Sequence, residues 1–253
     1  MIVPAVDSRA ASRIAADLID ISGNPSLLPE SPATQAAPPL PQLVADPAEV
    51  RVRADGALAH LGTDELRVGL SWTQYMLGDR LWGILLSAAH LHGVVPHIAD
   101  LRAPIGGGPR WPLMGTPRMT SHLESSPEEL ADALLGQIQP LMATLADTIG
   151  RCGKVNPRIL LGNTSTGIAL STRSLMGRGD DVALVHLATL VAERGGYADW
   201  YTGQLPGPIK RRTCCLYYRA ARRRPCGDCA LKDSAVVRAF QESAPTPATP
   251  ENA

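Results

Sequence analysis

Four cysteines fall within sixteen residues near the C-terminus, in the pattern C-C-x10-C-x2-C. They are Cys214, Cys215, Cys226 and Cys229. In an extended chain consecutive side chains point to opposite faces, so Cys214 and Cys215 can share a site only if the backbone turns there. Cys226 and Cys229 form a C-x-x-C turn, in which we expect Gly227 to take a positive φ. The pattern therefore predicts a compact module in which four thiols meet.

The N-terminal sequence shows no secretory signal, because no basic segment is followed by an apolar run and a cleavage site. The longest apolar tract, Trp82 to Val95, is shorter than the ~20 residues that cross a bilayer. We expect a cytoplasmic protein with no transmembrane segment and at most transient association with a membrane. In a reducing compartment, five cysteines favour metal binding or redox chemistry over a disulfide framework.

Three kinds of site are compatible with the cysteine spacing. A zinc knuckle draws two C-x2-4-C pairs around one tetrahedral ion, and adjacent cysteines fit that geometry poorly. A two-iron cluster is a wider target, with two ligand positions on each iron. A thioredoxin-like dithiol at Cys226 and Cys229 would leave Cys214 and Cys215 unexplained. The spacing favours a cluster, and an Arg-rich zinc module that binds nucleic acid or protein stays open as the alternative.

The rest of the chain has mainly helical patterns. Ser126-Pro127-Glu128-Glu129 is a capping box, and apolar residues follow it at spacings of three or four up to Ile149. Further predicted helices cover Leu70–Gly93, Arg158–Met176 and residues from Asp180 or Asp181 to Arg194. Short strands are predicted over Glu49–Arg53 and Arg110–Met119.

Residues around the cysteines resemble a known family. With Arg212-Thr213 before the first cysteine pair and Cys226-Gly227-Asp228-Cys229 at its end, the motif resembles the C-terminal signature of FhuF-like ferric-siderophore reductases. Weaker upstream matches, in the order typical of that family, are Ser71–Leu81, which contains Arg80-Leu81, then Pro96, then Leu161-Gly162-Asn163. Leu161 stands where the family has Trp. The matches span Thr63 to Leu231.

The resemblance implies a [2Fe-2S] cluster held by Cys214, Cys215, Cys226 and Cys229, and one-electron reduction of ferric iron in siderophore complexes. Reduction lowers the charge of the ion and weakens its bonds to hard oxygen donors, so Fe(II) would be released in the cytoplasm. No G-x-G-x-x-G fingerprint occurs, so we expect the electrons to come from a protein such as a ferredoxin. The expected partners are this donor and a ferric siderophore, without nucleic acid. An electron carrier with no small-molecule substrate is the related alternative.

Together these observations predict an α+β fold with a predominantly helical main domain and a small C-terminal cysteine-rich iron-sulfur module. Prolines concentrate between residues 24 and 47, a composition typical of an extended linker that buries no core. The predicted parts, in chain order, are an N-terminal helix (1–23), the Pro-rich linker (24–47), the siderophore-reductase-like domain (48–202), the [2Fe-2S] module (203–240) and a disordered tail (241–253).

Candidate substrate residues are few. Arg80 and Asn163 lie in the family-like stretches, and Trp111 lies in a Gly/Pro-rich loop. Each has a structural alternative: Arg80 can pair with a neighbouring aspartate, Asn163 can cap a helix, and Trp111 can belong to the core.

The basic residues are concentrated in the cysteine module. The whole chain has 24 basic and 24 acidic residues, yet residues 203–240 contain nine basic and only two acidic ones. Arg222, Arg223 and Arg224 lie between the two cysteine pairs. Such a cluster of positive charge can steer an anionic chelate or an acidic electron carrier to the site.

Neutralising Arg222, Arg223 and Arg224 together is therefore expected to slow reduction more at low salt than at high salt, because salt screens long-range attraction. Stopped-flow rates of chelate reduction at two ionic strengths measure the effect. Equal slowing at both ionic strengths would end the steering hypothesis.

Overall fold

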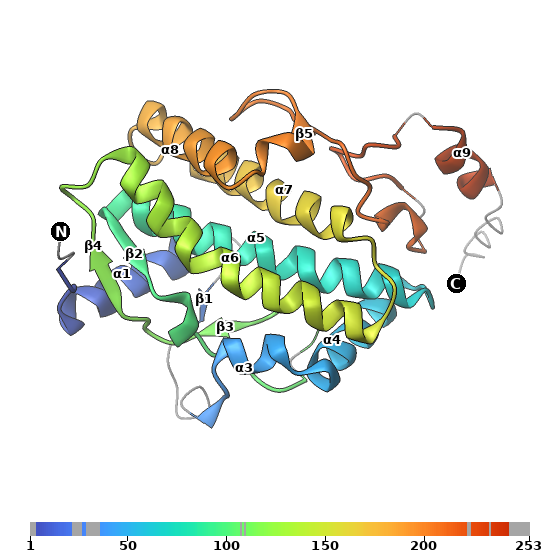
Figure 1. Ribbon diagram of the computed structural model, residues 1–253, viewed down its shortest axis with the longest axis horizontal. Coiled ribbons are helices and arrows are strands. Elements are labelled where there is room, and N and C mark those ends of the chain that lie inside the picture. The colour runs from blue at the N-terminus through green and yellow to red at the C-terminus, as the bar shows by residue number, and fades with distance from the viewer. Residues whose placement is uncertain are drawn as a thin grey trace, which may run out of the picture.

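The protein is mostly helical, as predicted, with small two-stranded sheets (Figure 1). The computed structural model describes residues 4–21, 27–28, 36–106, 108, 110–221, 224–232 and 234–242. The α-helices in these ranges are α1 (Ser8–Ile21), α3 (Leu40–Ala45), α4 (Pro47–Leu61), α5 (Leu66–His92), α6 (Pro127–Cys152), α7 (Pro157–Leu175), α8 (Asp181–Arg194) and α9 (Ala235–Glu242). The strands are β1 (Leu27–Leu28), β2 (Val94–Pro96), β3 (Leu113–Met114), β4 (Met119–Ser121), β5 (Tyr201–Thr202) and β6 (Lys210–Arg211). Short 3-10 helices cover Ile98–Asp100, Ala198–Trp200 and Tyr217–Arg219.

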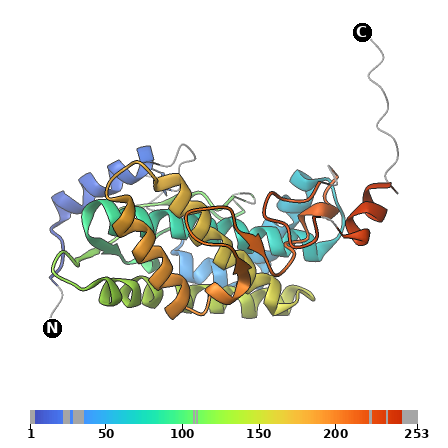
Figure 2. The same cartoon turned by 90° about the horizontal axis from the view of Figure 1, so that it is seen from above.

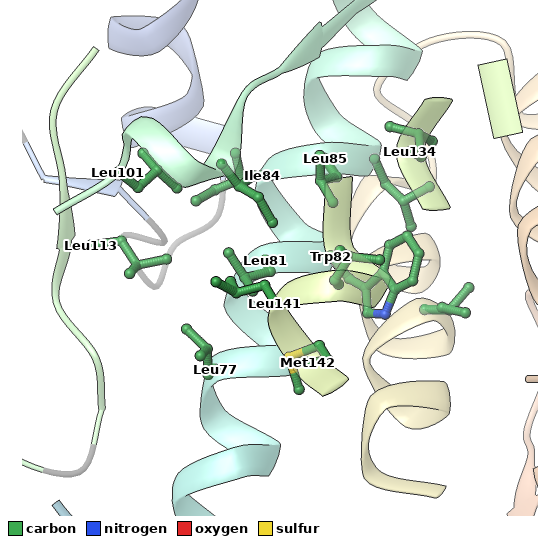
Figure 3. Packing of buried hydrophobic residues seen from close by; sticks show 14 of the residues in the cluster. Leu77, Leu81, Trp82, Ile84, Leu85, Leu101, Leu113, Leu134, Leu141 and Met142 are labelled. Carbon is green, nitrogen blue, oxygen red and sulfur yellow. The ribbon is translucent and has the colours of Figure 1, made fainter. Parts of the chain in front are cut away.

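Helix α5 forms the centre of the core. Six consecutive residues, Ile84 to Ala89, are all buried, so the helix is covered on every face. Helices α4, α6 and α7 pack against it, and α5, α6 and α7 run side by side along the molecule (Figure 1). In Figure 3, Leu81 and Trp82 of α5 lie close to Leu141 and Met142 of α6. None of the described helices is both long enough and apolar enough to cross a membrane.

Helices α5 and α7 approach closely where glycines face each other. A Cβ added to Gly167 of α7 would lie 3.1 Å from the carbonyl oxygen of Gly78 and 2.9 Å from the Trp82 ring. The absence of side chains at this crossing lets the two backbones pack directly. This close contact fixes the helix pair that supports the cysteine segment.

The main helix boundaries follow local sequence signals. The Ser126 hydroxyl accepts a hydrogen bond from the Glu129 amide, and the Glu129 carboxylate accepts one from the Ser126 amide, which confirms the capping box of α6. Helices α7 and α8 match their predicted ranges to within a residue or so. Helix α5 begins four residues earlier than predicted and ends before Gly93, whose φ is 61°.

The predicted strand over Glu49–Arg53 is wrong, because these residues lie in α4. Asp46 caps this helix by accepting a hydrogen bond from the Ala48 amide, and Pro47 occupies the first turn. The predicted strand over 110–119 is confirmed only at its two short strands, β3 and the first residue of β4.

The expectation that the Pro-rich segment buries no core is wrong for its described part. Leu27, Leu40 and Val44 are fully buried. Leu27 pairs with Leu113 in a parallel β1–β3 ladder, and Leu40 begins α3, whose first turn contains Pro41, a position that tolerates proline. Residues 243–253, predicted as a disordered tail, lie outside the described residues, and the predicted domain division at residue 203 stays a prediction.

A buried ion pair holds the Gly/Pro-rich loop against α4. The Arg53 guanidinium lies 2.6 Å from the Glu49 carboxylate, and their side chains are 0% and 4% exposed. Arg53 also donates to the carbonyl oxygens of Pro104 and Gly108 and stacks 4.0 Å from the centre of the Trp111 ring. The Glu49 carboxylate in turn accepts a hydrogen bond from the Gly106 amide. One charged pair thus satisfies several buried backbone groups of the loop.

Arg53→Met is expected to lower the free energy of unfolding by about 3 kcal/mol, because it leaves the Glu49 carboxylate buried without its partner. Arg51→Met is the matched control on the same helix. It breaks the Arg51–Asp55 pair, in which both side chains are 52% exposed, and is expected to cost less than about 1 kcal/mol. Urea denaturation compares the two, and equal losses would contradict the assigned role of the buried pair.

Candidate metal centre

The four cysteines of the C-terminal segment lie close together, at the end of the molecule far from α1 (Figure 2). The Cys215 and Cys226 sulfurs are 3.5 Å apart. Cys229 is buried, and Cys214 and Cys226 are half-buried. The prediction that the two cysteine pairs meet in one module is therefore confirmed.

The chain turns directly after the adjacent cysteines, as their spacing required. Leu216 has a φ of 69°, a left-handed conformation that is uncommon for a residue with a side chain. This turn lets the Leu216 amide donate a 3.3 Å hydrogen bond to the Cys214 sulfur. The expected positive φ at Gly227 is absent, so the special backbone conformation lies at the first cysteine pair instead of the second.

The second cysteine pair lies in a hydrogen-bonded turn. The Cys229 amide donates to the Cys226 carbonyl oxygen at 3.2 Å. The Leu231 amide donates to the Cys229 sulfur at 3.3 Å. Each cysteine pair thus provides one sulfur that already accepts a backbone hydrogen bond.

Helices α5 and α7 anchor the segment that carries Cys214 and Cys215. The Ser71 hydroxyl of α5 donates to the Cys215 carbonyl oxygen at 3.0 Å. Gly162 of α7 leaves no room for a side chain, since an added Cβ would lie 2.0 Å from the Thr213 hydroxyl oxygen. The cysteine segment therefore lies directly on the helix pair.

A cavity of about 200 Å³ opens beside two of the sulfurs. Its lining combines aromatic rings, charged groups and sulfur: Trp72, Tyr75, Arg211, Cys215, Tyr217, Cys226 and Asp228. Trp72 and Tyr217 stack with ring centres 5.4 Å apart, which packs the module against α5. On the other side of the module, the Tyr218 ring meets Phe240 of α9 edge to face.

The electrostatics of the cysteines are unequal. Hydrogen bonds with Cys214 and Cys226, together with the nearby Arg211 charge, hold the pKa of the Cys215 thiol well below its usual value. The same hydrogen bonds with Cys215, followed by burial, raise the pKa of the Cys214 and Cys226 thiols. Cys215 is thus the first of these three to become a thiolate.

The residues present fit a sulfur-ligated group by their chemistry. Four thiols, two sulfur-directed amides and a buried arginine surround one region. No set of three or more His, Cys, Asp or Glu side chains in the described part of the chain is already gathered closely enough to hold a metal ion. The cysteine side chains would have to rotate to bring their sulfurs together around such a group. The arrangement is compatible with a metal or cluster site.

The predicted substrate residues do not gather around this cavity. Trp111 is fully buried and donates from its indole nitrogen to the Thr73 carbonyl oxygen, which agrees with its structural alternative as a core residue. Arg80 is buried on α5 near Asp79 and does not line the cavity. Arg224 is exposed, whereas Arg222 and Arg223 lie outside the described residues.

Asn163 lies near the cysteines, but its side chain makes hydrogen bonds to other buried groups of the protein. It is fully buried on α7, and its side-chain nitrogen donates to the Ser71 carbonyl and hydroxyl oxygens at 3.0 and 3.1 Å. Its side-chain oxygen accepts a hydrogen bond from Arg211. The sequence contains no local signal that Arg211, one of several arginines near the cysteines, would be buried.

Comparisons with known proteins add nothing to the family resemblance of the cysteine motif. No family model, curated protein or solved structure matches this chain. The resemblance to FhuF-like ferric-siderophore reductases therefore rests on the residues quoted for it above.

Burial raises the pKa of Asp79, on α5 beneath the cavity-lining Tyr75, to about 6, against the opposing effect of Arg80. The folded protein thus binds the proton of Asp79 more tightly than the unfolded chain does. The neutral side chain stabilises the fold at low pH, and this contribution is lost as pH rises from about 4 to 6. Asp79→Asn is expected to raise the free energy of unfolding at pH 7.5 by about 2 kcal/mol and to change it little at pH 4. Urea denaturation at both pH values measures this. Asp147→Asn, which removes an exposed carboxylate from α6, is the control. Equal gains at both pH values would contradict this assignment.

Proposed function

We propose that this protein reduces ferric iron in siderophore complexes by one electron, through a [2Fe-2S] cluster held by Cys214, Cys215, Cys226 and Cys229. The observation that carries the proposal is the close grouping of the four cysteines beside a cavity with a buried cation. The unusual C-C-x10-C-x2-C spacing and its likeness to FhuF-like reductases support the same function.

The proposed chemistry needs few protein groups. When bound, the cluster supplies one electron at a time at a potential that its surroundings tune. Siderophores bind Fe(III) through hard oxygen donors, and the added electron lowers the charge of the ion and weakens those bonds. Release of Fe(II) therefore requires no cleavage of the chelator.

The residues of the chain orient and shield the site. Amides of Leu216 and Leu231 donate to sulfur, which stabilises the anionic form of two ligands. The stacked Trp72 and Tyr217 rings line the cavity beside Cys215 and Cys226 and are suited to limit access of water to a group bound there. Lower water access strengthens the electrostatic influence of nearby charges on the site.

Exposed basic groups surround the buried centre. Arg212 and Arg224 are exposed close to the two cysteine pairs in the chain. Their charge suits encounter with an anionic ferric chelate, or with an acidic electron donor such as a ferredoxin.

The test of this function begins with protein purified without oxygen. We expect two irons and two acid-labile sulfides per chain, a coloured protein, and a paramagnetic signal after reduction by dithionite. Reduced protein mixed with ferric hydroxamates or catecholates is then expected to become oxidised promptly by one of these chelate classes. A colourless protein with one zinc would overturn the proposal in favour of the zinc module. Oxidation only through a partner protein would favour an electron carrier.

Cysteine variants provide the matched control. Cys226→Ser is expected to lose most of the iron and sulfide, because it removes one of the four ligands. Cys152→Ser alters the fifth cysteine, which lies on α6 and donates to the Pro47 carbonyl oxygen, and is expected to keep both. Equal iron content in the two variants would exclude Cys226 as a ligand.

A further inference from the structure

Arg211 places a buried positive charge beside the cysteines. Its residue is only 3% exposed, and it lines the same cavity as Cys215, Cys226 and Asp228. Its Nη2 donates to the Asn163 side-chain oxygen, whereas its buried Nε has no hydrogen-bond partner. Among the described residues, Arg211 forms no ion pair with a carboxylate, although six other arginines do.

A buried guanidinium without an anion is costly. Removing an ion from water costs several kcal/mol, which only a nearby opposite charge and complete hydrogen bonding offset. Asp228 is the acidic residue on the cavity wall, but it makes no ion pair with Arg211, and its buried Oδ2 also lacks a hydrogen-bond partner. The lack of an ion pair between Arg211 and any described carboxylate, together with the free space of the cavity, is therefore suited to an anionic occupant next to Cys215 and Cys226.

The position of the guanidinium is fixed by the same groups that fix Cys215. Asn163 accepts from Arg211 and donates to Ser71, and the Ser71 hydroxyl donates to the Cys215 carbonyl oxygen. The Arg211 amide donates to the Asp228 carbonyl oxygen at 2.9 Å, which links it to the second cysteine pair. One buried network thus sets the distance between the cation and both pairs of sulfurs.

We propose that Arg211 is the internal counter-cation of the sulfur-ligated cluster and that it raises the reduction potential. The four thiolates make the cluster anionic, and gain of one electron makes it more so, hence a fixed nearby cation stabilises the reduced state. Burial protects this interaction from screening by salt, unlike the interaction with exposed arginines. The inference rests on the proposed [2Fe-2S] function and assigns to Arg211 a tuning role, with Asn163 and Ser71 as positioning residues.

Arg212 offers a matched control, because it is the neighbouring residue, carries the same charge and is exposed. Reduction potentials of the wild-type protein, Arg211→Gln and Arg212→Gln are measured by titration with dithionite, followed by paramagnetic resonance. At a fixed solution potential, Arg211→Gln is expected to lower the ratio of reduced to oxidised cluster at least tenfold, which is 59 mV for a one-electron couple. Arg212→Gln is expected to lower it less than threefold, with the effect vanishing at high salt.

A second pair of variants keeps the test decisive if Arg211→Gln fails to retain iron. Arg211→Lys keeps the charge but lacks the planar fork that reaches Asn163, so its potential is expected to lie below that of Arg212→Lys. Identical potentials in these two lysine variants, or in the two glutamine variants, would overturn the inference while leaving the cluster in place. Wild-type protein without iron and sulfide would overturn the proposed function together with this inference.

Discussion

Helix α5 must be covered on every side, because buried residues occur around its whole circumference. Helices α4, α6 and α7 supply most of this cover, and the short strands and the Pro-rich segment fill the remaining gaps. The glycine-lined crossing lets α7 pack closely against α5. The cysteine segment lies on that pair of helices, so the packed core holds the site in place.

Two buried polar side chains, one on α5 and one on α7, connect the core to the cysteine site. Ser71 and Asn163 are both buried, and their hydrogen bonds connect the two helices to Cys215 and Arg211. Buried polar groups are costly unless they are paired, which gives such networks a strong preference for one geometry. The candidate centre is therefore held by the same helices that form the core.

The buried arginines show two ways of accommodating a cation inside this protein. Arg53 has a carboxylate, two carbonyl oxygens and an aromatic ring around its guanidinium, and only its buried Nε lacks a hydrogen-bond partner. Arg211 has an amide oxygen and no carboxylate, and it faces a cavity lined by two sulfurs. This contrast is the basis for the proposed role of Arg211 as a counter-cation at the cysteine site.

Local patterns were sufficient to predict the capping box of α6, the ends of α7 and α8, and the meeting of the two cysteine pairs, since each depends on neighbours within a few residues. The spacing of Cys214 and Cys215 required a turn, and Leu216 makes it. Composition misjudged the Pro-rich segment, because Leu27 is buried through pairing with Leu113, which is distant in the chain. The strand predicted over residues 49–53 was wrong, because the Asp46 cap, Pro47 and the i,i+4 pair of Glu49 with Arg53 favour a helix locally. Only the tertiary structure decided that Arg211 is buried beside the sulfurs, because burial depends on how the segment docks on α5 and α7 and not on residue type.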